Sequence, residues 1–174
     1  MAVVIENKRI YLREMTVEDL SNLGSILKDE ETMYAYEASF TDKQVNSWFE
    51  CNLKSYQEHG FGLWTVIDKV TNQFVGQCGL VFSDVEGEQL LEVGYLLNKQ
   101  FWGKGYAREA SSLCLDYARK LGAPKVCSII RETNLPSRRV AEYNQMLVVH
   151  EYNKDYSGTA VKHLVYSINF ERKL

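Results

Sequence analysis

A turn with two glycines joins a strand-like run to a helix-like run, and this junction constrains the fold more than any other feature. Residues 90–97 (Leu-Leu-Glu-Val-Gly-Tyr-Leu-Leu) have the apolar character of a buried strand. The next residues contain Gly103 and Gly105, and an amphipathic pattern follows at once. A helix start carries backbone N–H groups without partners and the positive end of the helix dipole. The sequence therefore predicts a strand–turn–helix unit that binds a phosphate-like anion.

Two better-known phosphate motifs do not fit this turn. A dinucleotide fingerprint needs a third glycine three residues after the second, and that residue is Arg108. A P-loop needs Ser or Thr directly after Gly-Lys, and here Gly105 follows Lys104. The pattern that remains is Gln100-x-x-Gly103-x-Gly105.

This pattern resembles the acetyl-coenzyme A signature of the GNAT N-acetyltransferase superfamily. The longer string, Glu-Val-Gly-Tyr-Leu-Leu at 92–97 and Phe-Trp-Gly-Lys-Gly-Tyr-Ala-x-Glu-Ala at 101–110, looks like the RimJ/RimL-type branch. That branch includes enzymes that acetylate protein N-termini and others that act on small amines. The structural alternative is an ordinary strand-to-helix turn whose glycines allow tight packing.

The predicted elements match the GNAT layout over nearly the whole chain. We predict one N-acetyltransferase domain over residues 1–174, an α/β (α+β) fold with a mixed, mostly antiparallel sheet of about seven strands and helices on both faces. The order is β-α-α-β-β-β-α-β-α-β-β. Strands are expected at residues 5–15, 61–68, 73–82, 88–97, 125–131, 147–152 and 161–170. Helices are expected after capping boxes at Thr16-x-x-Asp19 and Thr41-x-x-Gln44, over 104–121 and after Asn134.

The resemblance implies three sets of residues that bind acetyl-coenzyme A. Backbone N–H groups at the turn would hold the pyrophosphate, with Lys104 and Arg108 either adding charge or lying on a solvated helix surface. The central strand would splay and bind the pantetheine arm, with a bulge at Gly94. A second signature, Asn-x-x-Ser, would face the cofactor, with Arg138 or Arg139 near the nucleotide phosphate. The predicted cofactor residues are Tyr95, Leu96, Leu97, Trp102, Gly103, Lys104, Gly105, Tyr106, Ala107, Asn134 and Ser137.

Glu92 is the candidate general base. It is a carboxylate within an otherwise apolar strand run, so it faces a polar cleft or has a raised pKa. An amine is mostly protonated at pH 7, and a base, acting directly or through water, prepares it to attack a thioester. The alternative is a carboxylate that pairs across the sheet with Lys or Arg. A backbone N–H of Leu96 or Leu97 could meet the oxyanion.

The sequence departs from the family pattern at two positions. The family often has a Tyr acid seven residues after the Asn of Asn-x-x-Ser, and here that residue is Ala141. Tyr143 lies on another face of the helix, which leaves Ser137, water or no dedicated acid. Gln145 stands where the family usually has Gly, so this residue takes a glycine-like turn at some cost or the turn is reshaped.

The acceptor is predicted to be an amine, either a small molecule or a protein N-terminus. The segment 29–41 and the final hairpin would shape its site, with Tyr34, Tyr36 and Glu37 as candidate residues. The stretch around Tyr34 is either a loop or a short helix. Two other functions stay open from the sequence: a non-catalytic acetyl-coenzyme A-binding sensor or scaffold, and a nucleotide-binding protein that uses the same turn.

Composition narrows the class further. A net charge of −3 argues against a nucleic-acid partner. The three histidines stand far apart and no Cys-x-x-Cys occurs, so no metal is expected. We expect no signal peptide and no membrane partner, since no apolar run approaches roughly 20 residues. Cysteines without paired spacing suit buried positions in a reducing cytosol. The expected location is cytoplasmic, and the oligomeric state, monomer or homodimer, stays open.

Overall fold

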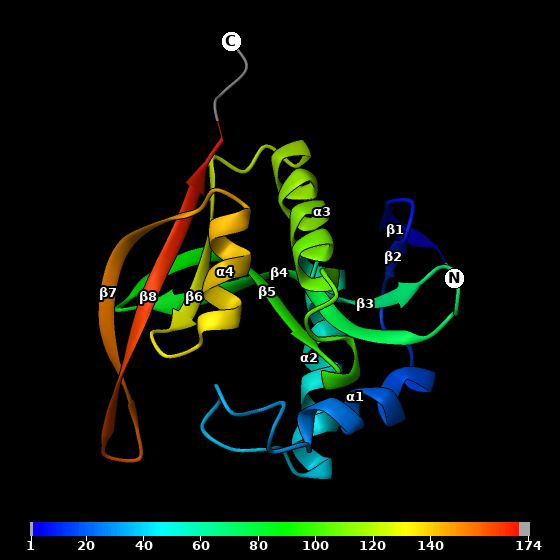
Figure 1. The fold of residues 1–174 in the computed structure, drawn as a ribbon, viewed down its shortest axis with the longest axis horizontal. Helices are drawn as coiled ribbons and strands as arrows, with labels where there is room; N and C mark the ends of the chain where they lie inside the picture. Colours follow the sequence, from blue (N-terminus) through cyan, green and yellow to red (C-terminus); the bar gives the residue numbers. More distant parts are fainter. Residues whose placement is uncertain (1, 171–174) are drawn as a thin grey trace.

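The structure, a computed structural model, describes residues 2–170 of the chain. One eight-stranded sheet has the order β1-β2-β3-β4-β5-β6-β8-β7. Helices α3 and α4 cover one face, and α1 and α2 cover the other (Figure 1). The predicted mixed sheet with helices on both faces is thus confirmed. No helix within residues 2–170 has the length and apolar character to cross a membrane.

The strands and helices lie close to their predicted positions. The strands are β1 (Val3–Glu6), β2 (Ile10–Arg13), β3 (Leu63–Asp68), β4 (Phe74–Val85), β5 (Glu88–Leu97), β6 (Lys125–Arg131), β7 (Leu147–Tyr156) and β8 (Thr159–Asn169). The helices are α1 (Leu20–Leu27), α2 (Asp42–His59), α3 (Tyr106–Lys120) and α4 (Leu135–Tyr143), with short 3₁₀ turns η1 (Val17–Asp19) and η2 (Lys99–Phe101). Both predicted capping boxes are present.

The sheet has one strand more than expected, because the predicted strand at 5–15 is a hairpin of β1 and β2. The side-chain oxygen of Asn7 accepts hydrogen bonds from the backbone N–H groups of Arg9 and Ile10, each at 2.8 Å. A side-chain turn of this kind reverses the chain. The prediction of one continuous first strand was therefore wrong, since an apolar pattern does not reveal a short Asn turn.

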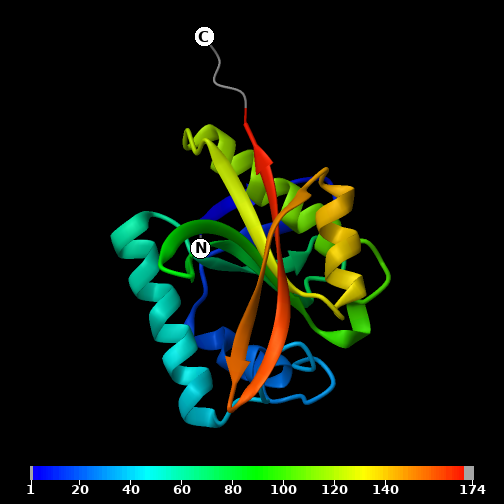
Figure 2. The ribbon, with the colours of Figure 1, turned by 90° about the vertical axis from the view of Figure 1, so that its left-hand side faces the viewer.

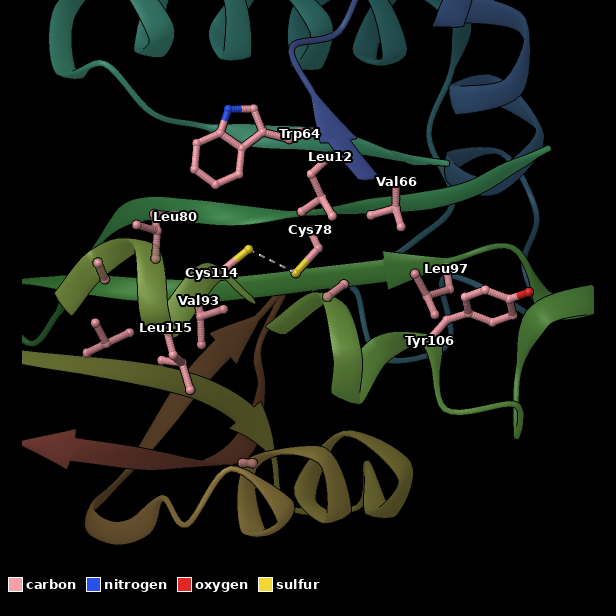
Figure 3. Packing of buried hydrophobic residues seen from close by; sticks show 14 of the residues in the cluster. Leu12, Trp64, Val66, Cys78, Leu80, Val93, Leu97, Tyr106, Cys114 and Leu115 are labelled. Carbon is pink, nitrogen blue, oxygen red and sulfur yellow. Dashed lines mark hydrogen bonds between the residues drawn. The ribbon is translucent and has the colours of Figure 1, made fainter. Parts of the chain in front are cut away.

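The main core holds the end of β5 and the start of α3 together. Leu97 of β5 and Tyr106 of α3 are 6% and 7% exposed. They lie close to each other in Figure 3. Burying an apolar side chain of this size contributes about 1.5–3 kcal/mol. In the same core cluster, the thiol sulfurs of Cys78 and Cys114 lie 3.5 Å apart as buried free cysteines. The glycine turn between Leu97 and Tyr106 is therefore anchored at both ends.

Strands β5 and β6 are parallel neighbours that pair at a single position. Glu92 lies opposite Cys127, and beyond this pair the two strands diverge. We call the space between the two strands beyond this pair the opening. On its other side, β5 pairs with β4 without a shift in register, and Gly94 stays opposite Gly79. The predicted bulge at Gly94 is therefore wrong, and the splay comes from separation of the strands.

Candidate functional site: the opening between β5 and β6

Backbone groups of β5 line the opening. The Asn98 N–H donates to the Val75 carbonyl at 3.0 Å. In this register, the backbone N–H and carbonyl groups of the even-numbered residues of β5 face β4. Backbone groups alternate from side to side along a strand. Tyr95 and Leu97 therefore point their N–H and carbonyl groups toward β6, whereas those of Leu96 face β4. Of the three β5 residues predicted to meet the pantetheine arm, two present their backbone to the opening.

The glycine turn has the geometry that an anion site requires. Gly103 has φ +71° and Gly105 has φ +84°, in the left-handed region that side chains with a Cβ rarely adopt. A Cβ on Gly103 would meet no atom within 4 Å, so its surface is open. Gly105 directly precedes α3, whose first N–H groups have no helical partner. The residues present therefore fit a pyrophosphate group, which is compact and anionic.

The side chain of Trp102 joins the glycine turn to the end of β5 by a hydrogen bond. Its indole N–H donates to the Leu97 carbonyl at 3.0 Å, while 40% of the residue stays exposed. Lys104 and Arg108 are exposed. The Arg108 guanidinium lies 5.0 Å from the centre of the Tyr143 ring. Both side chains thus lie on a solvent-exposed surface beside the turn, as the second of the two expectations for them states.

Asn134 and Ser137 lie on the other side of the opening, at the start of α4. The Asn134 side-chain oxygen accepts from the Ser137 N–H at 3.2 Å, as an N-cap does. The same oxygen accepts from the Tyr34 hydroxyl at 2.6 Å. The Tyr95 hydroxyl donates to the Ser137 carbonyl at 2.8 Å, across the opening. The first turn of α4 is thus fastened to β5.

The Glu92 carboxylate lies at the point where β5 and β6 separate. One oxygen accepts from the Ile129 N–H at 3.2 Å, and the other accepts from the Ser83 hydroxyl at 2.5 Å. The carboxylate therefore accepts a hydrogen bond from a β6 backbone N–H that has no backbone hydrogen-bond partner on β5. Burial raises the pKa of Glu92, against the opposing effect of these two hydrogen bonds. Within residues 2–170, Glu92 forms no ion pair with Lys or Arg.

Two tyrosines that lie far apart in the sequence approach Glu92. Burial, together with the charge of Glu92, raises the pKa of Tyr36 and of Tyr152 to about 12 each. Tyr36 is 36% exposed in the structure. Tyr36 was a predicted acceptor residue. Tyr152 of β7 and Ser83 of β4 were missed, because no local pattern marks either residue.

The segment 28–41 is a chain of turns, which resolves the choice between loop and short helix. We call it the acceptor loop. The Tyr34 ring packs edge-on against the Trp102 ring, with 6.5 Å between the ring centroids. The Tyr34 carbonyl accepts a hydrogen bond from the Arg131 side chain at 3.1 Å. Glu37 accepts from the Ser157 hydroxyl at 2.6 Å, at the tip of the β7–β8 hairpin. Figures 1 and 2 show the loop beside this tip. Tyr34 and Glu37 thus contact two different elements, the start of α4 and the tip of the β7–β8 hairpin.

The two departures from the expected pattern have clear structural positions. Ala141 is 1% exposed and packs in the core, so it supplies no proton. Gln145 has φ +61°, which confirms the strained turn expected there. A left-handed residue with a side chain costs roughly 1–2 kcal/mol. The Arg138 side chain donates to the Tyr166 hydroxyl and to the Glu132 carbonyl, each at 3.1 Å. These donors are therefore already used within the protein and do not point to a phosphate.

A groove of about 670 Å³ between α1 and α2 contains none of the predicted residues. Within residues 2–170, no cluster of three or more His, Cys, Asp or Glu side chains is placed to hold a metal ion.

A forked sheet beside a glycine turn at a helix start, with a half-buried carboxylate at the fork, makes up the candidate site. The chain belongs to the GNAT acetyltransferase family, because residues 9–146 match the model of the acetyltransferase (GNAT) domain. It is 37% identical over 138 residues to Bacillus subtilis YkkB, an alignment that covers 77% of this chain and 79% of that protein. It is 31% identical over 133 residues to an uncharacterized N-acetyltransferase, p20 of Bacillus licheniformis, with 75% and 74% covered.

Solved structures share the fold. A GNAT-family acetyltransferase from Bacillus anthracis superposes with a TM-score of 0.81 at 23% identity and covers 95% of this chain and 97% of that one. RimL, a ribosomal L7/L12 alpha-N-protein acetyltransferase in complex with coenzyme A, gives a TM-score of 0.78 at 16% identity, with 97% and 98% covered.

Proposed function

We propose that this protein moves acetyl from acetyl-coenzyme A directly to a primary amine, as RimJ/RimL-type enzymes do. The observation that carries the proposal is the Glu92 carboxylate at the fork, within the same opening as the glycine turn. Among proteins of this fold, RimL is in complex with coenzyme A and MccE is in complex with acetyl-coenzyme A. Backbone groups of residues 103–107 would hold the pyrophosphate, Tyr95 and Leu97 would meet the pantetheine amides, and Asn134 and Ser137 would border the cofactor.

Glu92 would act as general base. Acetyl-coenzyme A, when bound, supplies a thioester carbonyl carbon that a neutral amine can attack. A carboxylate with a raised pKa is a stronger base, and Ser83 and Ile129 fix its orientation while leaving lone pairs free. It removes a proton from the acceptor ammonium, directly or through water. No acid is assigned, since a thiolate can leave and take its proton from solvent.

The acceptor is a protein N-terminus or a small-molecule amine. The charge of Glu92 affects the pKa of Tyr36 and of Tyr152, and aromatic rings near a carboxylate suit an ammonium group. Two fold neighbours are ribosomal-protein acetyltransferases, RimL and a ribosomal-protein-S5-alanine acetyltransferase from Vibrio fischeri. Their names support a protein N-terminus as the first acceptor to test.

The test is a turnover assay that measures released thiol with a panel of acceptors. The panel holds peptides that begin with Ala, Ser or Met, together with polyamines and amino sugars. Thiol release that depends on one acceptor class, and that Glu92→Gln lowers, supports the proposal. The buried Ala141 favours a second function, a non-catalytic acetyl-coenzyme A sensor. Tight coenzyme A binding without thiol release for any amine would support that function instead.

A further inference from the structure

The Arg9 side chain reaches the glycine turn from the β1–β2 hairpin. Its Nη1 donates to the Lys104 carbonyl at 2.9 Å and to a Glu109 carboxylate oxygen at 2.8 Å. The centre of the guanidinium lies 3.7 Å from the centroid of the Tyr106 ring. Arg9 belongs to neither predicted motif, and it lies 95 residues from Lys104 in the sequence.

The Lys104 carbonyl controls the direction of a backbone N–H in the turn. A peptide unit is planar, so the Lys104 carbonyl and the Gly105 N–H point in opposite directions. Gly105 has φ +84°, and glycine accepts either sign of φ, so no Cβ at this residue opposes a flip of the peptide. Rotation would turn the carbonyl oxygen toward the anion and the N–H away from it. An anion site built from backbone N–H groups needs this peptide to stay in one orientation.

We propose that Arg9 is a positioning residue for coenzyme A: by holding the Lys104 carbonyl, it keeps the Gly105 N–H directed at the pyrophosphate. The inference rests on the proposed function, since it assumes that coenzyme A binds at this turn. It adds a residue outside the two motifs to the cofactor site.

Other parts of the fold hold Arg9 in place. The second oxygen of Glu109 accepts from the Asn7 side chain at 3.0 Å. The Tyr106 hydroxyl donates to Asp68 at 2.7 Å, and Asp68 is 5% exposed. These contacts join the β1–β2 turn, the β3–β4 turn and the first turn of α3. The Arg9 side chain is thus held by Glu109 and by the Tyr106 ring while it donates to the Lys104 carbonyl.

The experiment measures binding of coenzyme A and of pantetheine, which has the arm but lacks the pyrophosphate. Arg9→Met keeps the apolar contact with Tyr106 and removes the donors. We expect it to raise the Kd for coenzyme A about tenfold or more, or about 1.4 kcal/mol, with the pantetheine Kd unchanged. Lys8→Met removes an exposed neighbouring charge and should leave both Kd values within about twofold. Arg9→Lys should fall between wild type and Arg9→Met.

Glu109→Gln separates positioning from a direct contact with phosphate. If Arg9 bound phosphate itself, removing the neighbouring negative charge would strengthen coenzyme A binding. If Arg9 positions the turn, loosening its anchor weakens binding, and we expect this result.

Equal coenzyme A affinity in wild type and a folded Arg9→Met would overturn the inference and leave the proposed function intact. An equal loss for pantetheine would show general damage and would also overturn it. A wild-type protein that does not bind coenzyme A would refute the proposed function and the inference together.

Discussion

The cofactor side and the acceptor side of the opening are held together in different ways. On the cofactor side, key contacts join residues that are close in sequence: Trp102 bonds Leu97, and Ser137 bonds Asn134. On the acceptor side, the contact between Tyr34 and Asn134 joins residues 100 positions apart, and that between Ser157 and Glu37 joins residues 120 positions apart. The first side therefore combines local backbone geometry with a few distant contacts, such as that of Arg9 with Lys104, whereas the second depends on the completed fold throughout.

This difference predicts how substitutions act. A change in the glycine turn should alter the affinity for coenzyme A, because the backbone itself is the binding group. A change on the acceptor side should alter turnover or the KM for the amine and leave coenzyme A affinity nearly unchanged. Each prediction below tests this division, beginning with the largest effect.

Gly105→Val should have the largest effect on the cofactor side. Gly105 has φ +84°, which a β-branched residue resists, and the new side chain would lie at the anion surface. We expect the Kd for coenzyme A to rise about 100-fold, or about 2.7 kcal/mol. Isothermal titration calorimetry with coenzyme A measures this change.

Gly87→Val is the matched control. Gly87 has φ +89° and lies in the β4–β5 turn, away from the glycine turn, so it carries the same backbone strain. It should lower the melting temperature and leave coenzyme A affinity unchanged. Unchanged affinity in a folded Gly105→Val would show that the cofactor binds elsewhere.

Glu92→Gln should lower kcat by about 10²- to 10⁴-fold while the Kd for coenzyme A stays within about twofold. The amide keeps the size of the side chain, and its oxygen can still accept from the Ile129 N–H. Since the pKa of Glu92 is raised above its ordinary value of 4.5, the base forms as pH rises through that higher pKa. The wild-type kcat should rise over this range, and Glu92→Gln should lose that rise.

Glu88→Gln is the control on the same strand, since Glu88 is exposed and lies 3.4 Å from Lys125. It should retain wild-type kcat. A fully active Glu92→Gln would show that another group acts as the base or that none is needed. Loss of folded protein in Glu92→Gln would indicate that the carboxylate mainly joins β5 to β6.

Local signals explain which parts of the site could be predicted from the sequence. The glycine turn, the Asn134 cap and the strained Gln145 depend on backbone conformations that particular residues favour or resist. The position of Glu92 at the fork depends on where β6 leaves β5, and no residue pattern marks that point. Arg9 reaches the glycine turn, and Tyr152 comes near Glu92, only after distant strands have paired.

Tyr34→Phe should have a smaller effect, confined to the acceptor side. It removes the hydrogen bond to Asn134 and keeps the ring against Trp102. A hydrogen bond contributes about 0.5–1.5 kcal/mol, so we expect the KM for the amine to rise about two- to tenfold. Steady-state kinetics with the best acceptor measures this change. Tyr143→Phe, at a residue 59% exposed, is the control. A larger change in coenzyme A affinity than in amine KM would contradict the division between the two sides.

The β7–β8 hairpin contains a buried histidine that makes the acceptor side sensitive to pH. His163 is 5% exposed. Its Nδ1 lies 2.9 Å from the Val161 carbonyl, which only accepts, so Nδ1 carries the hydrogen. Its Nε2 then accepts from the Tyr156 hydroxyl at 3.3 Å. Burial lowers the pKa of His163, and the charges of Lys154 and Arg131 add to this effect. The folded hairpin therefore favours the neutral ring.

We expect the smallest effect from titration of this ring. Because its folded pKa lies below the ordinary value of 6.5, the unfolded chain binds the proton more readily. The stability that the neutral ring provides is complete above pH 6.5 and is lost as pH falls through the folded pKa. Hydrogen exchange, corrected for its intrinsic pH dependence, should show weaker protection of β7 and β8 at acidic pH, with α3 unchanged. His163→Gln should abolish the difference, whereas His150→Gln, at an exposed ring beside Glu86, should preserve it. Persistence of the effect in His163→Gln would assign it to another group, and equal loss of protection in α3 would show that the two sides of the opening unfold together.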